Sequence, residues 1–350
     1  MMNFAIVGCG HIAKKHADAI KNSDEASLLA VCDTVQEKMV PFFEEYGVKG
    51  FLSLDELLEQ EDVDVINICT PSGFHADIAV KAAQAGKHIV VEKPIALTLE
   101  DANRIISASK EYGVKLSVVH PNRFRPAIME TRKLMDENKF GKLSHANATV
   151  RWNRNQAYYD QAPWRGTKSL DGGVLMNQAI HNLDLLVWLM GEVDEVFSMG
   201  ATRLRDIESE DVSLGVVRFK NGALGVIEAA TTIYPRNLEE TLSIFGETGT
   251  LKIGGMTANL IEHINIEEMD DQISNELIDR VKSDPFGKPG HQWIIEDMVD
   301  AIKNEREPIV TGKDGKNALA LVIALYESAD SNRPVKLLDT SADTNRPIKL

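Results

Sequence analysis

The feature that most constrains the fold of this chain is the turn after its first apolar run. Residues 4–7 read Phe-Ala-Ile-Val, and Gly8-x-Gly10-x-x-Ala13 follows at once and opens a helix-like segment. In this context the spacing predicts a dinucleotide-binding turn. Gly8 permits the tight bend, Gly10 lets backbone N–H groups approach a pyrophosphate, and Ala13 allows close packing of helix on strand. The pyrophosphate would then lie at the positive end of the helix.

Apolar runs and helix-like segments alternate through the first third of the chain. This alternation predicts an α/β domain with a doubly wound parallel sheet, because parallel strands need crossover helices. Both faces of such a sheet are covered, which suits continuous apolar runs. The predicted strands are 4–7, 28–32, 63–69, 88–91 and 114–118, and the predicted helices are 11–22, 34–46, 73–85 and 98–111.

The pattern changes after residue 121, so we expect a dinucleotide-binding domain over 1–121 and a substrate-binding and oligomerisation domain over 122–350. Strand-like runs 212–219 and 223–228 flank Asn221-Gly222, which is a strong hairpin signal. Further helices are predicted near 124–137, 171–189, 290–303 and 314–329. The tail repeats itself at 332–337 and 345–350, as a local duplication or a pair of edge strands.

Composition narrows the class of protein. The net charge of -15, from 38 basic and 53 acidic residues, argues against a nucleic-acid binder. Cys9, Cys32 and Cys69 form no zinc-like spacing, so we expect reduced, buried cysteines and no metal site. The chain enters a strand at once and has no apolar run of membrane-spanning length, which predicts a cytoplasmic protein without a signal peptide or membrane contact.

Asp33 ends the second predicted strand, at the distance where a ribose-binding acid is expected. It should accept hydrogen bonds from the adenosine ribose and repel a 2′-phosphate. Residues 34–36 contain no arginine to receive that phosphate, so NAD is favoured over NADP. The alternative is that Asp33 only caps the following helix. The loop Thr70-Pro71-Ser72 follows another strand and should cover the nicotinamide half, with His75 either touching it or serving a structural role.

Several motifs in combination resemble the Gfo/Idh/MocA oxidoreductases, named after glucose–fructose oxidoreductase and inositol dehydrogenase. The markers are Gly8-Cys9-Gly10-His11-Ile12-Ala13, Thr70-Pro71-x-x-x-His75, the run from Ala85 to Glu92-Lys93-Pro94, Trp164-Arg165, and Gly172-Gly173 through His181-x-x-Asp184. The resemblance implies a Rossmann domain followed by an open, predominantly antiparallel sheet with helices, and a nicotinamide between the two. It also implies that the Lys93–Pro94 peptide is cis. The cofactor residues that it implies besides Gly8, Gly10 and Asp33 are His11, Ile12, Thr70, Pro71, Ser72, His75, Glu92, Lys93, Asn122, Trp164 and Arg165.

Lys93 follows a predicted strand and should end near the nicotinamide, where an ammonium can stabilise developing alkoxide charge. An ordinary surface pair with Glu92 is the alternative, although strand alternation points the two side chains apart. His181 is suited to accept the hydroxyl proton, and Asn177, four residues earlier, should share its helix face. The alternative is that His181 is a core histidine. Many family members carry aspartate at the position of Asn177, which leaves the general base open between His181 and Lys93.

The stretch 150–167 is the most informative about substrate, because it combines cations, aromatics and amides. Arg151, Arg154 and Arg236 are candidates for a carboxylate or diphosphate, and Tyr159 for a sugar contact. With the residues from Leu175 to His181, this stretch is similar to the UDP-N-acetyl-2-amino-2-deoxyglucuronate 3-dehydrogenase subgroup.

That similarity implies NAD-dependent oxidation of the sugar C3 hydroxyl to a ketone, in the synthesis of bacterial surface polysaccharide. The alternatives are a dehydrogenase of a free sugar or inositol-like polyol and a non-catalytic cofactor-binding regulator. The open sheet predicts a homo-oligomer, a tetramer or a dimer.

Overall fold

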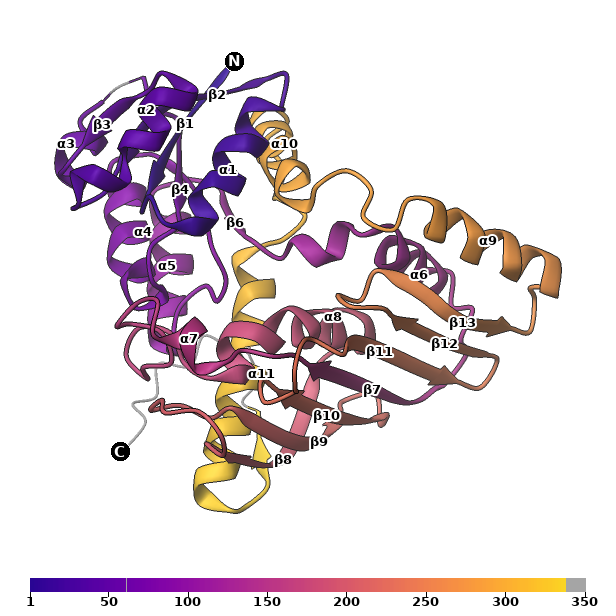
Figure 1. Ribbon diagram of the computed structural model, residues 1–350. Coiled ribbons are helices and arrows are strands. Elements are labelled where there is room, and N and C mark those ends of the chain that lie inside the picture. Colours follow the sequence, from indigo (N-terminus) through magenta and orange to yellow (C-terminus); the bar gives the residue numbers. More distant parts are fainter. Residues whose placement is uncertain (61, 338–350) are drawn as a thin grey trace.

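The first third of the chain forms a parallel sheet in the computed structural model, which describes residues 1–60 and 62–337 (Figure 1). The six strands lie in the order β3-β2-β1-β4-β5-β6, and every neighbouring pair is parallel. This confirms the doubly wound α/β prediction. The strands are β1 (Met2–Val7), β2 (Ala26–Cys32), β3 (Lys49–Phe51), β4 (Val65–Ile68), β5 (His88–Val91) and β6 (Leu116–Val118).

Five α-helices connect or flank these strands: α1 (His11–Lys21), α2 (Val40–Tyr46), α3 (Leu54–Leu58), α4 (His75–Gln84) and α5 (Leu99–Glu111). The helix predicted over 34–46 is in fact a short 3-10 turn, η1 (Gln36–Lys38), followed by α2. Pro41 explains the break, because proline lacks an N–H and is tolerated only in the first turn of a helix.

The second sheet has eight strands in the order β13-β12-β11-β7-β10-β9-β8-β14. All neighbours are antiparallel except β7 and β10, which confirms an open, predominantly antiparallel sheet. Its strands are β7 (Leu143–Arg151), β8 (Val193–Ala201), β9 (Val212–Phe219), β10 (Leu224–Ala230), β11 (Glu239–Gly246), β12 (Gly249–Gly254), β13 (Leu260–Ile266) and β14 (Val335–Lys336). The predicted hairpin is β9–β10, and Gly222 supplies the positive φ of +89° that its turn needs.

Helices cover one face of this sheet and lead the chain back to the first (Figure 1). They are η3 (Pro121–Phe124), α6 (Pro126–Asp136), α7 (Gln156–Tyr159), η4 (Val174–Ala179), α8 (Ile180–Met190), α9 (Asp271–Ser283), α10 (Gly290–Lys303) and α11 (Gly312–Ser331). The helix predicted over 171–189 is thus a π-helical turn, η4, continued by α8.

The last two helices both pack against elements of the N-terminal sheet, and α11 packs against β8 of the second sheet as well. α10 lies on α1, where the amide of Gln292 donates to the carbonyl of Asn22 at 2.9 Å. α11 lies against α5 and β6, so closely that a Cβ at Gly315 would come within 2.8 Å of Val118. The backbone N–H of Val118 also donates to the carbonyl of Val310 at 3.1 Å.

The other face of the second sheet exposes a group of large apolar side chains. They are Met199, Leu214, Val216, Leu224 and Val226 on β8, β9 and β10, each about half exposed or more. Of the repeated tail, residues 335–336 form the edge strand β14 on β8, whereas 345–350 lie outside the described residues. No helix in the described part of the chain has the length and hydropathy to cross a bilayer.

Candidate active site

The predicted cofactor turn has the geometry that a pyrophosphate requires. Gly8 has a φ of +93°, and a Cβ there would lie 2.7 Å from the backbone N of Thr70, so only glycine fits. Gly10 is exposed at the N-terminus of α1, and a Cβ would meet nothing within 4 Å. The first turn of α1 holds no acidic side chain. The open helix end with His11 and Ile12 is therefore free to receive an anion.

Asp33 braces this turn. Its carboxylate accepts a hydrogen bond from the N–H of Cys9 and another from the N–H of Val35, both at 2.9 Å. Lys38 lies 3.9 Å away. Asp33 does not cap the helices that follow, because the N-cap residues of η1 and α2 are Val35 and Met39 and neither helix has a side-chain cap. Its bond from Cys9 holds the carboxylate beside the Gly8–Gly10 turn.

The loop after β4 forms the next wall of the cofactor site. The hydroxyl of Thr70 is buried and meets no hydrogen-bonding partner in residues 1–60 and 62–337, and Pro71 and Ser72 are half-buried. An unpaired buried hydroxyl beside the glycine turn fits a bound dinucleotide. His75 is fully buried, with its ring nitrogens 2.9 Å from the carbonyl of Pro94 and 3.1 Å from that of Thr70. His75 thus joins the two loops.

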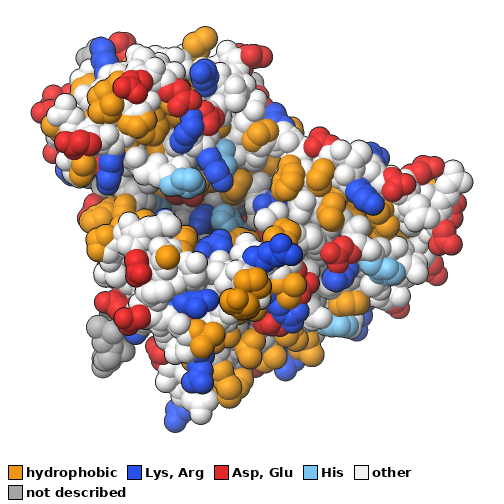
Figure 2. All heavy atoms as spheres, in the orientation of Figure 1, with side chains coloured by type: hydrophobic (Ala, Val, Ile, Leu, Met, Phe, Trp, Pro, Cys, Tyr) orange, Lys and Arg blue, Asp and Glu red, His pale blue; other side chains and the backbone are white. Residues whose placement is uncertain are grey.

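A cavity of about 400 Å³ lies between the two sheets and brings together Lys93, His181 and Asn122. Figure 2 shows this hollow, in which basic and histidine side chains gather between the upper and lower parts of the molecule. The volume falls within the range of small-molecule sites. The remaining walls come from α1, η3, β7 and the start of α10, and include Ile12, Glu92, Arg125, Trp152, Phe286 and His291.

Lys93 lies just after the end of β5, as predicted, and its place beside a nicotinamide stays a prediction. Its ammonium donates to the backbone carbonyl of Asn177 at 2.7 Å, and the Lys93–Pro94 peptide is cis as expected. Burial lowers the pKa of Lys93, while the charges of Glu92 and Asp171 act to raise it. Lys93 is therefore a partly desolvated cation that faces the second domain.

Glu92 points away from Lys93 into a different cluster. Its carboxylate lies 2.9 Å from Nε2 of His16 on α1 and 3.4 Å from Nε2 of His291 on α10. The other ring nitrogen of His16 contacts the amide of Asn67 at 2.9 Å. These groups fix the base of the loop that carries Lys93, and they replace the surface pair considered from sequence.

His181 lies in the first turn of α8, on the cavity. Burial holds its pKa well below the usual range, and the positive charge of Lys93 adds to the effect. Nδ1 of His181 has no hydrogen-bonding partner within the described chain. The imidazole is therefore neutral near pH 7 and able to accept a proton.

That Asn177 shares a helix face with His181 stays a prediction. Asn177 lies in the π-helical turn η4, directly before the helix α8 that carries His181. Its side-chain amide donates to the carboxylate of Asp171, which also accepts from the N–H of Gly166 at 2.7 Å. Asp171 therefore supplies beside Asn177 the negative charge that asparagine itself lacks.

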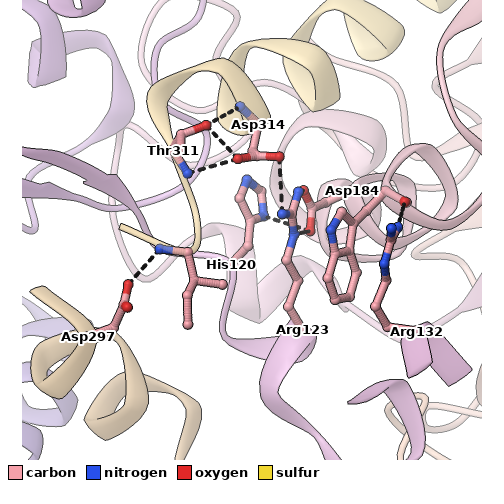
Figure 3. A network of polar contacts seen from close by, with 9 residues as sticks. His120, Arg123, Arg132, Asp184, Asp297, Thr311 and Asp314 are labelled. Atoms are coloured by element: carbon pink, nitrogen blue, oxygen red, sulfur yellow. Dashed lines mark hydrogen bonds and ion pairs between the residues drawn. The ribbon is translucent and has the colours of Figure 1, made fainter. Parts of the chain in front are cut away.

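A buried ion-pair network holds α8 in place (Figure 3). The guanidinium of Arg123 on η3 donates two bonds, of 2.8 and 2.6 Å, to the carboxylate of Asp184. Arg123 also lies 3.2 Å from Asp314 on α11, and His120 lies 3.7 Å from Asp184. The network ties the helix of His181 to the elements around the cofactor side.

The stretch after β7 forms a cluster of aromatic and basic residues beside this cavity. The guanidinium of Arg165 lies 4.3 Å from the ring centre of Tyr158 and 4.8 Å from that of Trp164, and Arg154 lies over Trp152 and Tyr158. The charges of Arg154 and Arg165 both act on Lys93. These residues therefore lie within electrostatic reach of the predicted reaction site.

The other predicted substrate contacts lie elsewhere. Arg151 forms ion pairs with Glu228 and Glu239 at 2.6 and 2.5 Å. Tyr159 is buried, with its hydroxyl 3.3 Å from that of Thr231, and Arg236 is exposed on the loop before β11. The cavity thus does not bring these three together with Lys93 and His181.

Comparison with known proteins identifies two segments that together cover most of the chain. A model described as the oxidoreductase family with an NAD-binding Rossmann fold matches residues 2–120. A second, described as the GFO/IDH/MocA C-terminal domain, matches residues 128–252.

Two similar solved structures are WlbA dehydrogenases in complex with NADH and UDP-GlcNAcA. The Bordetella pertussis protein is 37% identical with a TM-score of 0.91, and the match covers 97% of this chain and 98% of that chain. The Chromobacterium violaceum protein is also 37% identical, with a TM-score of 0.90 and 96% of each chain covered. A more distant relative, the myo-inositol 2-dehydrogenase of Thermotoga maritima, is 28% identical over 96% of this chain and 98% of its own.

Proposed function

The chain belongs to the Gfo/Idh/MocA family and is an NAD-dependent oxidoreductase, and from this premise we propose that it oxidises the C3 hydroxyl of a UDP-linked N-acetylated amino-sugar uronic acid to a ketone. The observation that carries the proposal is the 37% identity, over nearly the whole chain, to WlbA dehydrogenases in complex with NADH and UDP-GlcNAcA. The meeting of Lys93 and His181 in one cavity supports it. The product is a precursor for an amino sugar of a bacterial surface polysaccharide, made in the cytoplasm.

The residues at the cavity have different roles in the proposed oxidation. When bound, NAD supplies the acceptor for the hydride that leaves C3. His181 accepts the hydroxyl proton, because its imidazole is held neutral by burial and by the charge of Lys93. Lys93 keeps its proton and donates a hydrogen bond to the oxygen, which stabilises the developing alkoxide. Asn177 and Asp171 hold the turn whose carbonyl orients the Lys93 ammonium.

The remaining predicted contacts complete the proposed site. We assign the glycine turn with His11 and Ile12, Asp33, the Thr70–Ser72 loop and Asn122 to the cofactor, together with Trp164 and Arg165. His75 shapes this site through the two loops that it joins. Within residues 150–167, Arg154 remains the proposed contact to an anionic group of the substrate. Its guanidinium lies over Tyr158, as that of Arg165 does, and its charge acts on the pKa of Lys93. The exposed apolar face of the second sheet supports a homo-oligomer.

A second candidate function is oxidation of a free inositol or sugar. The inositol dehydrogenases of Thermotoga maritima and Bacillus subtilis favour it, at 28% and 27% identity over at least 95% of this chain. A free polyol carries no nucleotide and no carboxylate. The two functions therefore differ in what the cavity must bind besides the reacting hydroxyl.

The test is to mix the protein with NAD, a ketone trap and UDP-N-acetylglucosaminuronic acid, and to follow NADH absorbance. The trap is needed because oxidation of a secondary alcohol near neutral pH can stall at equilibrium. NADH formation with this substrate, and not with myo-inositol, is the expected result. The Lys93→Ala and His181→Ala variants should each lose about 10²-fold or more in kcat. Turnover of inositol alone would favour the second candidate, and cofactor binding without turnover of either substrate would favour a regulator.

A further inference from the structure

Arg125 differs from the arginines described above because its side chain donates no hydrogen bond to a described residue. Arg123 and Arg151 are held by carboxylates, and Arg154 and Arg165 donate to Asn153 and Tyr158. The side chain of Arg125 lines the cavity, is 18% exposed, and donates no hydrogen bond to any described residue. Nη1 of its guanidinium is buried without a hydrogen-bonding partner among the described residues, and an unpaired buried donor is costly.

The nearest opposite charge does not satisfy Arg125. Oε2 of Glu240 on β11 lies 4.0 Å from Nη1, which is beyond hydrogen-bonding distance. Glu240 is 1% exposed, and neither of its oxygens has a partner in the described part of the chain. The neighbouring amide of Asn182 donates to the carbonyl of Thr241, and its proximity acts to lower the pKa of Glu240. The pair is therefore a poor brace for the fold.

Resting on the proposed function, we propose that Arg125 is the residue that binds an oxyanion of the substrate, by two parallel N–H···O bonds. Arg125 precedes α6, at the end of η3, and its charge acts on His181, so the anion would lie close to the reacting hydroxyl. Both anionic groups of a UDP-linked uronic acid meet this condition. The carboxylate is attached to C5 and the diphosphate to C1, and each of these carbons is two ring bonds from C3.

Glu240 opposes this binding in a way that can be measured. Its carboxylate competes with the substrate anion for the same guanidinium and repels that anion. Burial raises the pKa of Glu240 to about 7 against the pull of Arg125, the charged side chain that faces it. Glu240 is therefore mostly ionised at about pH 8, and Glu240→Gln should bind the anion more tightly there.

The experiment is calorimetric titration of the NADH-loaded protein, in which no oxidation can occur. The ligands are UDP-N-acetylglucosaminuronic acid and UDP-N-acetylglucosamine, which share the diphosphate and differ in the carboxylate. Arg125→Gln should weaken binding by about 30-fold or more, the effect of losing one partner of a buried charged hydrogen bond. Arg125→Lys keeps the charge but loses the two parallel N–H donors of the guanidinium. It replaces Arg125→Gln in the test if the glutamine variant fails to fold. The matched control is Arg280→Gln, which removes an exposed arginine paired with Glu130.

The outcomes separate the possibilities. A loss on both ligands identifies the diphosphate as the anion, and a loss confined to the uronic acid identifies the carboxylate. Unchanged affinity for both ligands in the Arg125 variants would overturn the inference. Weaker ligand binding by Glu240→Gln would also overturn the inference. If the Arg125–Glu240 pair only supported the fold, the Arg125 and Glu240 variants would both lose affinity. If the unaltered protein binds neither ligand, the proposed function fails, and the inference fails with it.

Discussion

Replacing Asp184 by asparagine should destabilise the protein more than any change at a surface ion pair. The Arg123 and Asp184 side chains are only 3% and 2% exposed, and two charge-assisted hydrogen bonds join them. Breaking a buried pair by removing one charge typically costs about 3–5 kcal/mol, because the other charge stays desolvated. The introduced amide would still accept one bond and Asp314 would remain 3.2 Å from Arg123, so we expect the lower end, about 3 kcal/mol.

Thermal and urea denaturation of the two proteins measure this loss, with an expected fall in Tm of about 5 °C. The matched control is Glu307→Gln, which removes a pair with Lys115 whose glutamate is 71% exposed and should cost less than about 1 kcal/mol. Replacing both charges, as Arg123→Met with Asp184→Leu, should recover much of the loss, since neither member of the pair is left as a buried charge and Asp314 keeps its bonds from Thr311. The reasoning is refuted if Asp184→Asn shifts Tm no more than the control does.

Three further results are expected. Gly8→Ala should raise the KM for NAD at least about tenfold and lower Tm, because the new Cβ would strike the Thr70 backbone at a φ of +93°; an unchanged KM would contradict the assigned turn. Asp33→Ala should weaken NAD binding about tenfold and narrow the preference for NAD over NADP, measured as KM for each, since a ribose acceptor and a repelling charge are both lost. The acid limb of the plot of log kcat against pH should have its midpoint below pH 6.5, because the lowered pKa of His181 keeps this base deprotonated down to lower pH. A midpoint above pH 6.5 would exclude His181 as the base.

Much of the fold could be predicted because its signals are local. Alternating apolar runs and helix-like segments indicate the parallel sheet, and the Gly8 turn indicates the end of the sheet where a dinucleotide binds. Two short elements, β3 and α3, were not predicted, because segments of three and five residues leave too little periodicity. The helix α9 was also missed, since it buries only Ser274, Leu277 and Val281. The π-helical turn at Asn177 is a matter of backbone geometry that residue types do not reveal.

The position of Lys93 could be predicted, because Lys93 comes just after the apolar strand β5. The site was not predictable where partners come from distant strands. Arg151 has the composition of a substrate ligand, but the register of β7 with β11 places Glu239 directly opposite it. In the sequence, Arg125 resembles any charged residue that precedes a helix. Its lack of a hydrogen-bonded carboxylate depends on the position of Glu240, which is far along the chain. The division of the chain at residue 121 stays a prediction.

The return of α10 and α11 to the first sheet has a consequence for the order in which the chain can fold. The residues that form β1 to β6 are synthesised before α10 and α11, which supply part of their cover. Val118 receives its partner from Val310 and packs against Gly315, so this side of the nascent sheet stays exposed through most of translation. The β1–β6 sheet is therefore completed only after α10 and α11 have been made, and a ribosome stalled before residue 290 would carry a sheet that lacks part of its cover.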